Sequence, residues 1–243
     1  MATEPLHFAR APIIEAIIGI QVAALPETSL ADFRAIGEQV RTDYPNQTEI
    51  SFTQFTGQVL PQPSASATQT LIGLQFQSAD QRQLFQARLN GFSFHRLAPY
   101  GNWDSFRGEA FRKWQLYRNA AGPMQMEVFS VRYINRLVVP APGQLEHYIK
   151  VYPEIPPELP QMLRNYLLRL ELPLEEGGGV LTMHETMLPS EPGTASILLD
   201  NDFRYPAMGI TEDQLWDRID LARHQKNNVF LACITEEMRR RIS

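Results

Sequence analysis

Cysteine is nearly absent from this chain, which contains one, Cys233, in 243 residues. A single cysteine excludes an intrachain disulfide and a cluster of thiolate metal ligands, and it fits a reducing compartment. No apolar run approaches the roughly 20 residues of a membrane-spanning helix. The opening residues MATEPLHFARAP also lack the basic segment and the apolar core of a secretory signal. These absences predict a cytoplasmic protein that makes no membrane contact.

The chain also has no excess of positive charge, since it contains 22 Lys and Arg residues and 27 Asp and Glu residues. Broad contact with a phosphate backbone needs the opposite balance, so nucleic acid is not an expected partner. Gly177-Gly178-Gly179 has no following Lys-Ser/Thr, which a phosphate loop requires, and no Gly-x-Ser-x-Gly nucleophile elbow occurs. The sequence therefore predicts no cofactor and favours a protein that is not an enzyme.

Apolar residues make up 44 % of the chain and charged residues 20 %, which is enough apolar content for a core. The stretch Met126–Pro140 is rich in β-branched and aromatic residues and predicts a long strand near the middle of a sheet. Because side chains alternate along a strand, we expect its core side to carry Phe129, Val131, Tyr133, Asn135, Leu137 and Val139. The other side carries Arg132 and Arg136.

An arginine in apolar surroundings needs a carboxylate or several carbonyls to offset its loss of water. A second apolar stretch, Ile13–Val22, predicts a buried strand in which Glu15 is the one charged residue. Glu15 shares a face with Ile17, and it is the natural partner for Arg132 or Arg136.

Glu15, Arg132, Asn135 and Arg136 thus form the main polar set in the sequence, and it has two interpretations. The structural one is an ion pair that fixes the register of two neighbouring strands and needs no ligand. The functional one is a polar cluster inside a cavity that binds an anionic or polar ligand. The structural interpretation is favoured, because ion pairs between adjacent strands are common.

Local patterns predict further elements before the central strand. Ser29 is an N-cap, with Asp32 at the third helical position, for a helix whose apolar face continues to Tyr44. Residues 48–59 predict a strand, 61–69 a polar loop within a hairpin excursion, and 71–76 another strand.

Asn90-Gly91 predicts a type I′ hairpin turn. If these two residues form the loop, Leu89 pairs with Phe92 and Ala87 with Phe94. A helix is expected over 103–117, with Trp103, Phe106, Ala110, Trp114 and Tyr117 on one face.

The sequence after Pro140 changes character, because prolines crowd residues 141–162 and interrupt regular structure. We therefore expect an N-terminal α+β half over 1–140, a Pro-rich connection over 141–162, and a C-terminal half over 163–243.

In the C-terminal half, strands are predicted over 165–172, Val180–Leu188 and 195–205, joined as an antiparallel meander. Thr211 and Gln214 form a capping box for a long helix that should lie across the meander, with Cys233 as an inert buried thiol. The predicted fold class is α+β, with an extended, largely antiparallel sheet, three main helices and a C-terminal β-β-β-α unit. One curved sheet and two adjacent small lobes are both compatible with this order.

His184, Asp200 and Asp202 are of the residue types that ligate metals. His184 and Glu185 are adjacent in a strand and point to opposite faces, so at most one of them can join such a set. The helical spacing of a zinc protease is also absent. Solvated strand ends are therefore favoured over a metal site. The basic residues 239–241 near the end suit solvent and a helix C-terminus.

Three segments carry a resemblance: APIIEA at 11–16, RYINRL at 132–137, and HQKNNVF at 224–230 followed by Ile234-Thr235. Together they resemble a sporadically distributed family of uncharacterised bacterial and archaeal proteins of similar length. The resemblance implies no established activity. The patchy distribution of that family implies accessory genes, such as defence or toxin–antitoxin components.

The sequence thus favours a non-catalytic binding or regulatory module that acts through protein–protein contacts, with another protein or with a second copy as a homodimer. The alternative is a small-ligand pocket between a curved sheet and a helix, with Glu15, Arg132, Asn135 and Arg136 inside. A metal-dependent enzyme at His184 is a second alternative.

Overall fold

Nine strands form one antiparallel sheet in a computed structural model that describes residues 8–25, 28–58, 64–141, 145–161 and 163–243. Their order across the sheet is β2-β3-β4-β5-β1-β6-β9-β8-β7. The strands are β1 (Ile13–Val22), β2 (Asn46–Gln58), β3 (Ser64–Gln77), β4 (Gln83–Arg88), β5 (Gly91–Leu97), β6 (Met126–Pro140), β7 (Leu167–Pro173), β8 (Val180–Leu188) and β9 (Thr194–Pro206). Strand β1, the first described strand along the chain, is therefore the central strand of the sheet.

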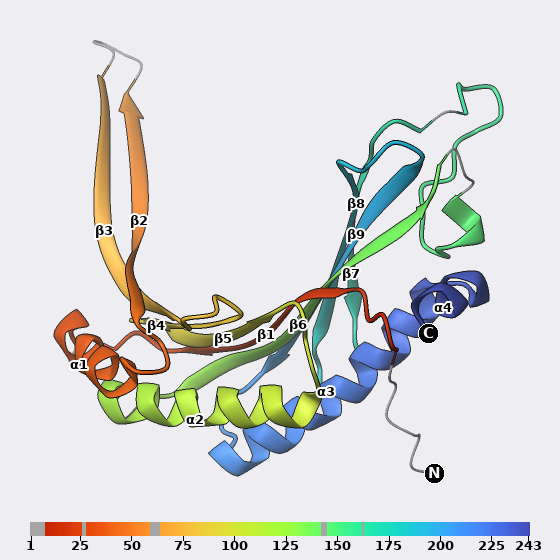
Figure 1. Ribbon diagram of the computed structural model, residues 1–243. Helices are drawn as coiled ribbons and strands as arrows, with labels where there is room; N and C mark the ends of the chain where they lie inside the picture. The colour runs from red at the N-terminus through yellow and green to blue at the C-terminus, as the bar shows by residue number, and fades with distance from the viewer. Residues whose placement is uncertain (1–7, 26–27, 59–63, 142–144, 162) are drawn as a thin grey trace.

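The helices are α1 (Leu30–Val40), α2 (Trp103–Ala121), α3 (Glu212–Cys233) and α4 (Glu236–Ile242), with a short 3₁₀ turn, η1, at Leu145–His147. The three long helices lie on one face of the sheet, where α1 packs on β3, α2 on β5, and α3 on β6 and β9 (Figure 1). The β2–β3 hairpin and the β7–β9 end both rise away from these helices, so the sheet is curved. We call the concave side, which faces away from α1, α2 and α3, the open face.

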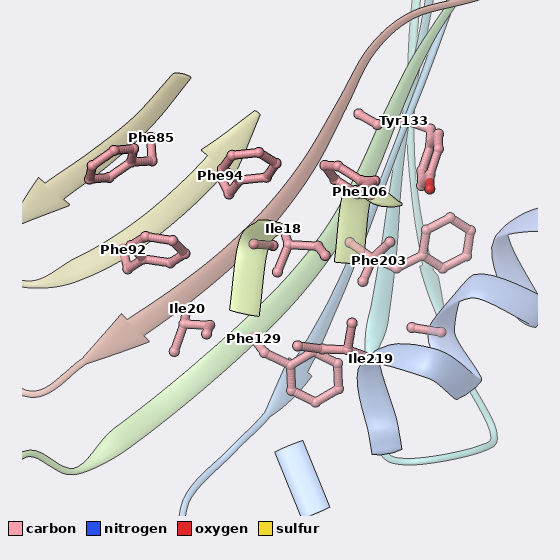
Figure 2. Packing of buried hydrophobic residues seen from close by; sticks show 14 of the residues in the cluster. Ile18, Ile20, Phe85, Phe92, Phe94, Phe106, Phe129, Tyr133, Phe203 and Ile219 are labelled. Atoms are coloured by element: carbon pink, nitrogen blue, oxygen red, sulfur yellow. The ribbon is translucent and has the colours of Figure 1, made fainter. Parts of the chain in front are cut away.

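The core lies between the sheet and the helices. Figure 2 shows side chains of β1, β4, β5 and β6 pointing toward Phe106 of α2 and Ile219 of α3. Ile18 and Phe94 are fully buried there. Burying a large apolar side chain stabilises the fold by about 1.5–3 kcal/mol. The apolar stripe of each helix and the apolar side of each central strand therefore select this layered arrangement.

This architecture confirms the predicted fold class, and one curved sheet rather than two lobes is present. The bounds of Ile13–Val22, Met126–Pro140 and Val180–Leu188 agree with the predicted strands. Ser29 is the N-cap of α1, where its N–H donates to Asp32 Oδ2 at 2.8 Å, and the predicted capping box of Thr211 and Gln214 forms at the start of α3.

The ends of two helices differ from the prediction. Helix α1 ends at Val40, and Tyr44 lies beyond it, although the Tyr44 ring is buried and its hydroxyl donates to Glu109 at 3.0 Å. Helix α2 continues one turn past the predicted end, to Ala121, where Gly122 with φ 72° provides the C-cap.

The predicted loop at 61–69 is wrong in its second part, because residues 64–69 belong to β3. Their backbone pairs with β2, for example Gln69 with Thr53, so ladder hydrogen bonds override the polar composition. The predicted hairpin excursion is present as β2–β3. Val59 and residues 61–63 lie outside the described residues.

The register predicted at Asn90-Gly91 is also wrong. Ala87 pairs with Phe92, so the loop is Leu89-Asn90 and Gly91 is the first residue of β5. Gly91 also pairs with Gln21 of β1, and Val22 N–H donates to Asn90 O at 3.1 Å. Pairing with β1 therefore places the turn one residue before the position that its local sequence prefers, which shifts the strand pairing by two residues. The core and solvent faces of both strands are unchanged by this shift, because a displacement of two residues preserves alternation.

The predicted halves share the single sheet, since β6 and β9 pair along thirteen residues, from Val128 with Pro206 to Pro140 with Thr194. The connection over 141–162 contains η1, and its Pro142 lies outside the described residues. Across the described parts of the chain, no helix is both long and apolar enough to span a membrane.

Candidate functional site on the open face of the sheet

A row of small residues crosses the middle of the open face. Gly19 of β1 pairs with Ser93 of β5 on one side and with Ser130 of β6 on the other. A Cβ atom on Gly19 would lie 2.7 Å from Ser130 Oγ. Three adjacent strands thus carry no side chain larger than a hydroxymethyl group at this level, which leaves a depression in the sheet surface.

The two neighbouring rows carry longer polar side chains. His95, Arg132 and Asp202 lie on one side of the small row, and Arg88 and Gln21 lie on the other. The depression has a volume of about 240 Å³, and we call it the hollow. Its lining includes Gly19, Arg88, Ser93, Ser130, Arg132 and Arg204.

Glu15 binds His95, which was not among its predicted partners. Its Oε1 lies 2.7 Å from His95 Nδ1 on β5, and the side chains are 27 % and 15 % exposed. The hydrogen bond to His95 is the main reason why the pKa of Glu15 is lowered, and the charge of Arg132 adds to the effect. The predicted direct pairing of Glu15 with Arg132 or Arg136 is therefore wrong, although Arg132 is close enough to act on it electrostatically.

Arg132 instead binds Asp200 on β9, through Nε at 2.8 Å and a terminal nitrogen at 2.6 Å. Asp200 is almost fully buried, and this pair raises the pKa of Arg132. Two parallel charge-assisted bonds of this kind are strong and directional. The pair joins β6 to β9, whereas the predicted ion pair would have joined β6 to β1 through Glu15.

The other two predicted residues lie apart from this group. Arg136 donates to Ser196 Oγ at 3.2 and 3.1 Å, outside the lining of the hollow. Asn135 faces the helices, is 3 % exposed and donates to Leu199 O at 3.3 Å. The predicted set is thus divided between both sides of the sheet, and the hollow lies on the side opposite to the helices.

The residues considered for a metal make other contacts. His184 Nδ1 is 3.8 Å from Asp200 Oδ2, whose carboxylate is bound by Arg132. Within the described ranges, no three His, Cys, Asp or Glu side chains meet in a way that could hold a metal ion. Glu185 points to the helix side, where Tyr166 OH donates to it at 2.6 Å and burial raises its pKa to about 7.

The hydrogen bonds of His95 fix the direction of a third contact. Because ionised Glu15 can only accept, His95 Nδ1 must carry a proton. In a neutral imidazole Nε2 is then an acceptor, so the Ser93 hydroxyl, 2.9 Å away, donates to it. Sequence reasoning missed Ser93, His95, Arg88 and Gly19 as a group. Gly19, inside an otherwise β-branched strand, was the signal, since such a glycine marks a close approach.

Comparison of the chain with protein-family models gives no match, and comparisons with the curated proteins and with the solved structures give none either.

Proposed function

We propose that this protein is a non-catalytic binding or regulatory module that acts through protein–protein contacts, and that the β2–β3 hairpin is the contacting element. The observation that carries this proposal is the exposure of two phenylalanines on β2, where Phe52 is 57 % and Phe55 is 81 % exposed. The hairpin rises away from the helices, and a two-stranded ribbon has no core of its own (Figure 1). Burial against another protein would remove this apolar surface from water.

The occupant we propose is a second copy of this chain. Strand β2 is at the edge of the sheet and is 13 residues long. It contains no Pro and no Lys or Arg, and its one charged residue is Glu49. Edge strands that must stay unpaired are usually short or carry such residues. Antiparallel pairing of two β2 strands across a twofold axis would continue the sheet and give each phenylalanine, one on either face of the ribbon, a cross-strand neighbour on its own face. The resemblance to an accessory-type family adds the expectation that such a module serves a defence or toxin–antitoxin system.

Native mass spectrometry tests this proposal on the full chain. We expect a species of twice the 27.7 kDa chain mass, and its loss in the double variant Phe52→Ser/Phe55→Ser. The matched control is Met208→Ser/Leu221→Ser, which removes two other exposed apolar side chains and should retain the dimer. A monomer that carries a second polypeptide, lost in the hairpin variant alone, would replace the second copy by another protein. A monomer without any partner would refute the proposal.

A second candidate function is the binding of a small anionic ligand in the hollow, and Arg88 is the observation that favours it. Arg88 Nε is buried without a hydrogen-bond partner in the described structure, and a terminal nitrogen donates to Ser93 Oγ at a long 3.5 Å. Burial lowers the pKa of Arg88, but an arginine remains charged in proteins. A desolvated guanidinium with unused donors is suited to a carboxylate or a phosphate.

The other two arginines that line the hollow, Arg132 and Arg204, already have acceptors. Arg132 is bound to Asp200, and Arg204 lies 3.8 Å from Asp202 and donates to Gln21 at 3.0 Å. Asp202 also lines the hollow, with Arg132 and Arg204 as its neighbours. Arg88 is therefore the residue best placed to bind an added anion.

Isothermal titration calorimetry with inorganic phosphate and with succinate tests this second function and separates the two chemistries. We expect saturable binding of one probe and at least a tenfold loss of affinity in Arg88→Met. The control Arg169→Met removes an arginine from the exposed edge strand β7 and should bind as the wild type does. If neither anion binds, or if Arg88→Met binds normally, this function is refuted.

A further inference from the structure

Ser93, His95 and Glu15 stand in the order nucleophile, base and acid. Ser93 Oγ is 2.9 Å from His95 Nε2, and His95 Nδ1 is 2.7 Å from Glu15 Oε1. The direction of the proton follows from the acid, because a carboxylate that only accepts leaves Nε2 free to accept from the serine. These are the contacts by which a histidine activates a serine for attack on an acyl carbon, with the acid orienting the imidazole.

The fold holds this group in one geometry. Ser93 and His95 are two residues apart on β5 and therefore point to the same face. Glu15 comes from β1, which pairs with β5 in the register of Glu15 with Leu97 and Ile17 with His95. All three side chains are thus positioned by the paired strands at the centre of the sheet, without a flexible loop between them.

The group opens on the hollow. Ser93 is 3 % exposed, and both Ser93 and His95 belong to the lining of the 240 Å³ hollow. Gly19 pairs with Ser93 and adds no side chain above it. The terminal nitrogen of Arg88 lies 3.5 Å from Ser93 Oγ, so it is within reach of an oxygen on a carbon bonded to that Oγ. A guanidinium in this position can stabilise the oxyanion of a tetrahedral intermediate.

We propose that Ser93 is a nucleophile that, with His95 as general base, hydrolyses small acyl esters in the hollow. Ser93 Oγ forms a bond to the acyl carbon while its proton passes to His95 Nε2. The C–O bond to the alcohol breaks, and the alcohol leaves with that proton. Water, deprotonated by His95 Nε2, then attacks the acyl carbon. The bond between that carbon and Ser93 Oγ breaks, His95 returns the proton to Ser93 Oγ, and the carboxylic acid is released. Glu15 is a positioning residue in this scheme, since it touches the imidazole and not the substrate.

Arg88 also defines the preferred substrate class. Because Arg88 Nε has no hydrogen-bond partner among the described residues, an acyl group that carries a second, anionic carboxylate is expected to be favoured over a neutral one. This part of the inference deepens and rests on the second candidate function, which places a small anion at Arg88. Hydrolysis in the hollow would give the module of the first proposal a catalytic activity in place of its non-catalytic character, and it is independent of the contact made by the β2–β3 hairpin.

The first experiment treats the full-length protein with diisopropyl fluorophosphate, which phosphorylates an activated serine with loss of fluoride. Intact mass and peptide mapping report the site of the adduct. We expect one adduct, on Ser93, that is lost in Ser93→Ala and in His95→Gln. Ser196→Ala is the matched control, because Ser196 lies on the same sheet outside the lining of the hollow and has no hydrogen bond to His95 among the described side-chain contacts. It should label as the wild type does.

The second experiment measures release of 4-nitrophenol from 4-nitrophenyl acetate and from the 4-nitrophenyl monoester of succinate. We expect a kcat/KM for the succinyl ester at least tenfold above that for the acetyl ester, with this preference lost in Arg88→Met. Glu15→Gln should lower kcat while leaving KM unchanged, whereas a merely unfolded variant would lose labelling and circular dichroism together.

Absence of an adduct on the wild-type protein, or an adduct on a residue other than Ser93, would overturn the inference even if the variants fail to fold. Saturable anion binding without labelling or turnover would leave the binding function intact and refute the hydrolysis. Labelling without a preference for the succinyl ester would refute the role of Arg88.

Discussion

The guanidinium of Arg132 on β6 binds the carboxylate of Asp200 on β9 through two hydrogen bonds of 2.8 and 2.6 Å. The side chain of Asp200 is 6 % exposed, whereas that of Arg132 is 38 % exposed. The acid is therefore the partner that depends on the pair, because it would otherwise remain charged and buried.

Arg132→Met is expected to lower the free energy of unfolding by about 2–3 kcal/mol, less than for a fully buried pair because Arg132 is partly solvated. Urea unfolding at neutral pH measures the change. Arg169→Met is the control, since Arg169 and its partner Glu171 are both 55 % exposed, and it should change stability by less than about 0.5 kcal/mol. Adding Asp200→Asn to Arg132→Met should recover part of the loss. Equal effects of the two arginine variants would contradict this account.

The Glu185 carboxyl predicts how stability depends on pH. Burial raises the pKa of Glu185 from 4.5 to about 7 in the folded state, so between these values the folded protein binds more protons than the unfolded chain. Stability must then fall as pH rises through this interval, by up to about 3 kcal/mol, and the full loss is present above pH 7.

Glu185→Gln removes this titration and should retain the hydrogen bond from Tyr166. Urea unfolding of the wild type and the variant between pH 4.5 and 8 isolates the effect, because every other ionisable group is common to both proteins. The variant should gain stability relative to the wild type as pH rises. A difference between the two proteins that is constant over this range would exclude the raised pKa.

The same substitution by alanine is expected to destabilise the protein more at Gly91 than at Gly19. A Cβ on Gly91, at φ 153°, would lie 2.5 Å from the backbone oxygen of Ile20, which cannot move without disrupting β1. A Cβ on Gly19 would meet Ser130 Oγ, which can rotate away. Gly91→Ala should therefore destabilise the protein by about 2 kcal/mol, and Gly19→Ala by less than about 1 kcal/mol.

Thermal unfolding of both variants measures this difference. Gly19→Ala should also reduce binding of small anions, because the new methyl group projects from the floor of the hollow. Combining it with Ser130→Ala should relieve the close contact. If Gly19→Ala is the more destabilising of the two single substitutions, the register of β1 with β5 and β6 is not as described.

The capping box of α3 gives a local prediction. Thr211 Oγ1 accepts from Gln214 N–H at 3.3 Å, and Gln214 Oε1 accepts from Thr211 N–H at 2.9 Å. Thr211→Ala should lower the free energy of unfolding by about 1 kcal/mol, while Thr211→Ser should change it by only a few tenths. Differential scanning calorimetry compares the two, and identical transitions would show that the cap does not stabilise the helix.

The sequence alone determined the elements whose signals are local. Met126–Pro140 and Ile13–Val22 are strands because their residues favour a pleated, buried surface, and Thr211 begins a helix because its cap satisfies the first free N–H groups. Strand alternation also assigned the buried side of β6 correctly, including Asn135. These properties require no knowledge of which strands become neighbours.

Tertiary structure alone decided the partners. The insertion of β1 between β5 and β6 brought His95 to Glu15, shifted the turn at Asn90, and aligned Gly19 with Ser93 and Ser130. Asp200 reached Arg132 from 68 positions away along the chain, through the pairing of β6 with β9. Strand order depends on which long-range pairings together bury the most apolar surface, and residue types within a segment do not carry that information. The hollow therefore exists only in the assembled sheet, even though the sequence contains every residue that lines it.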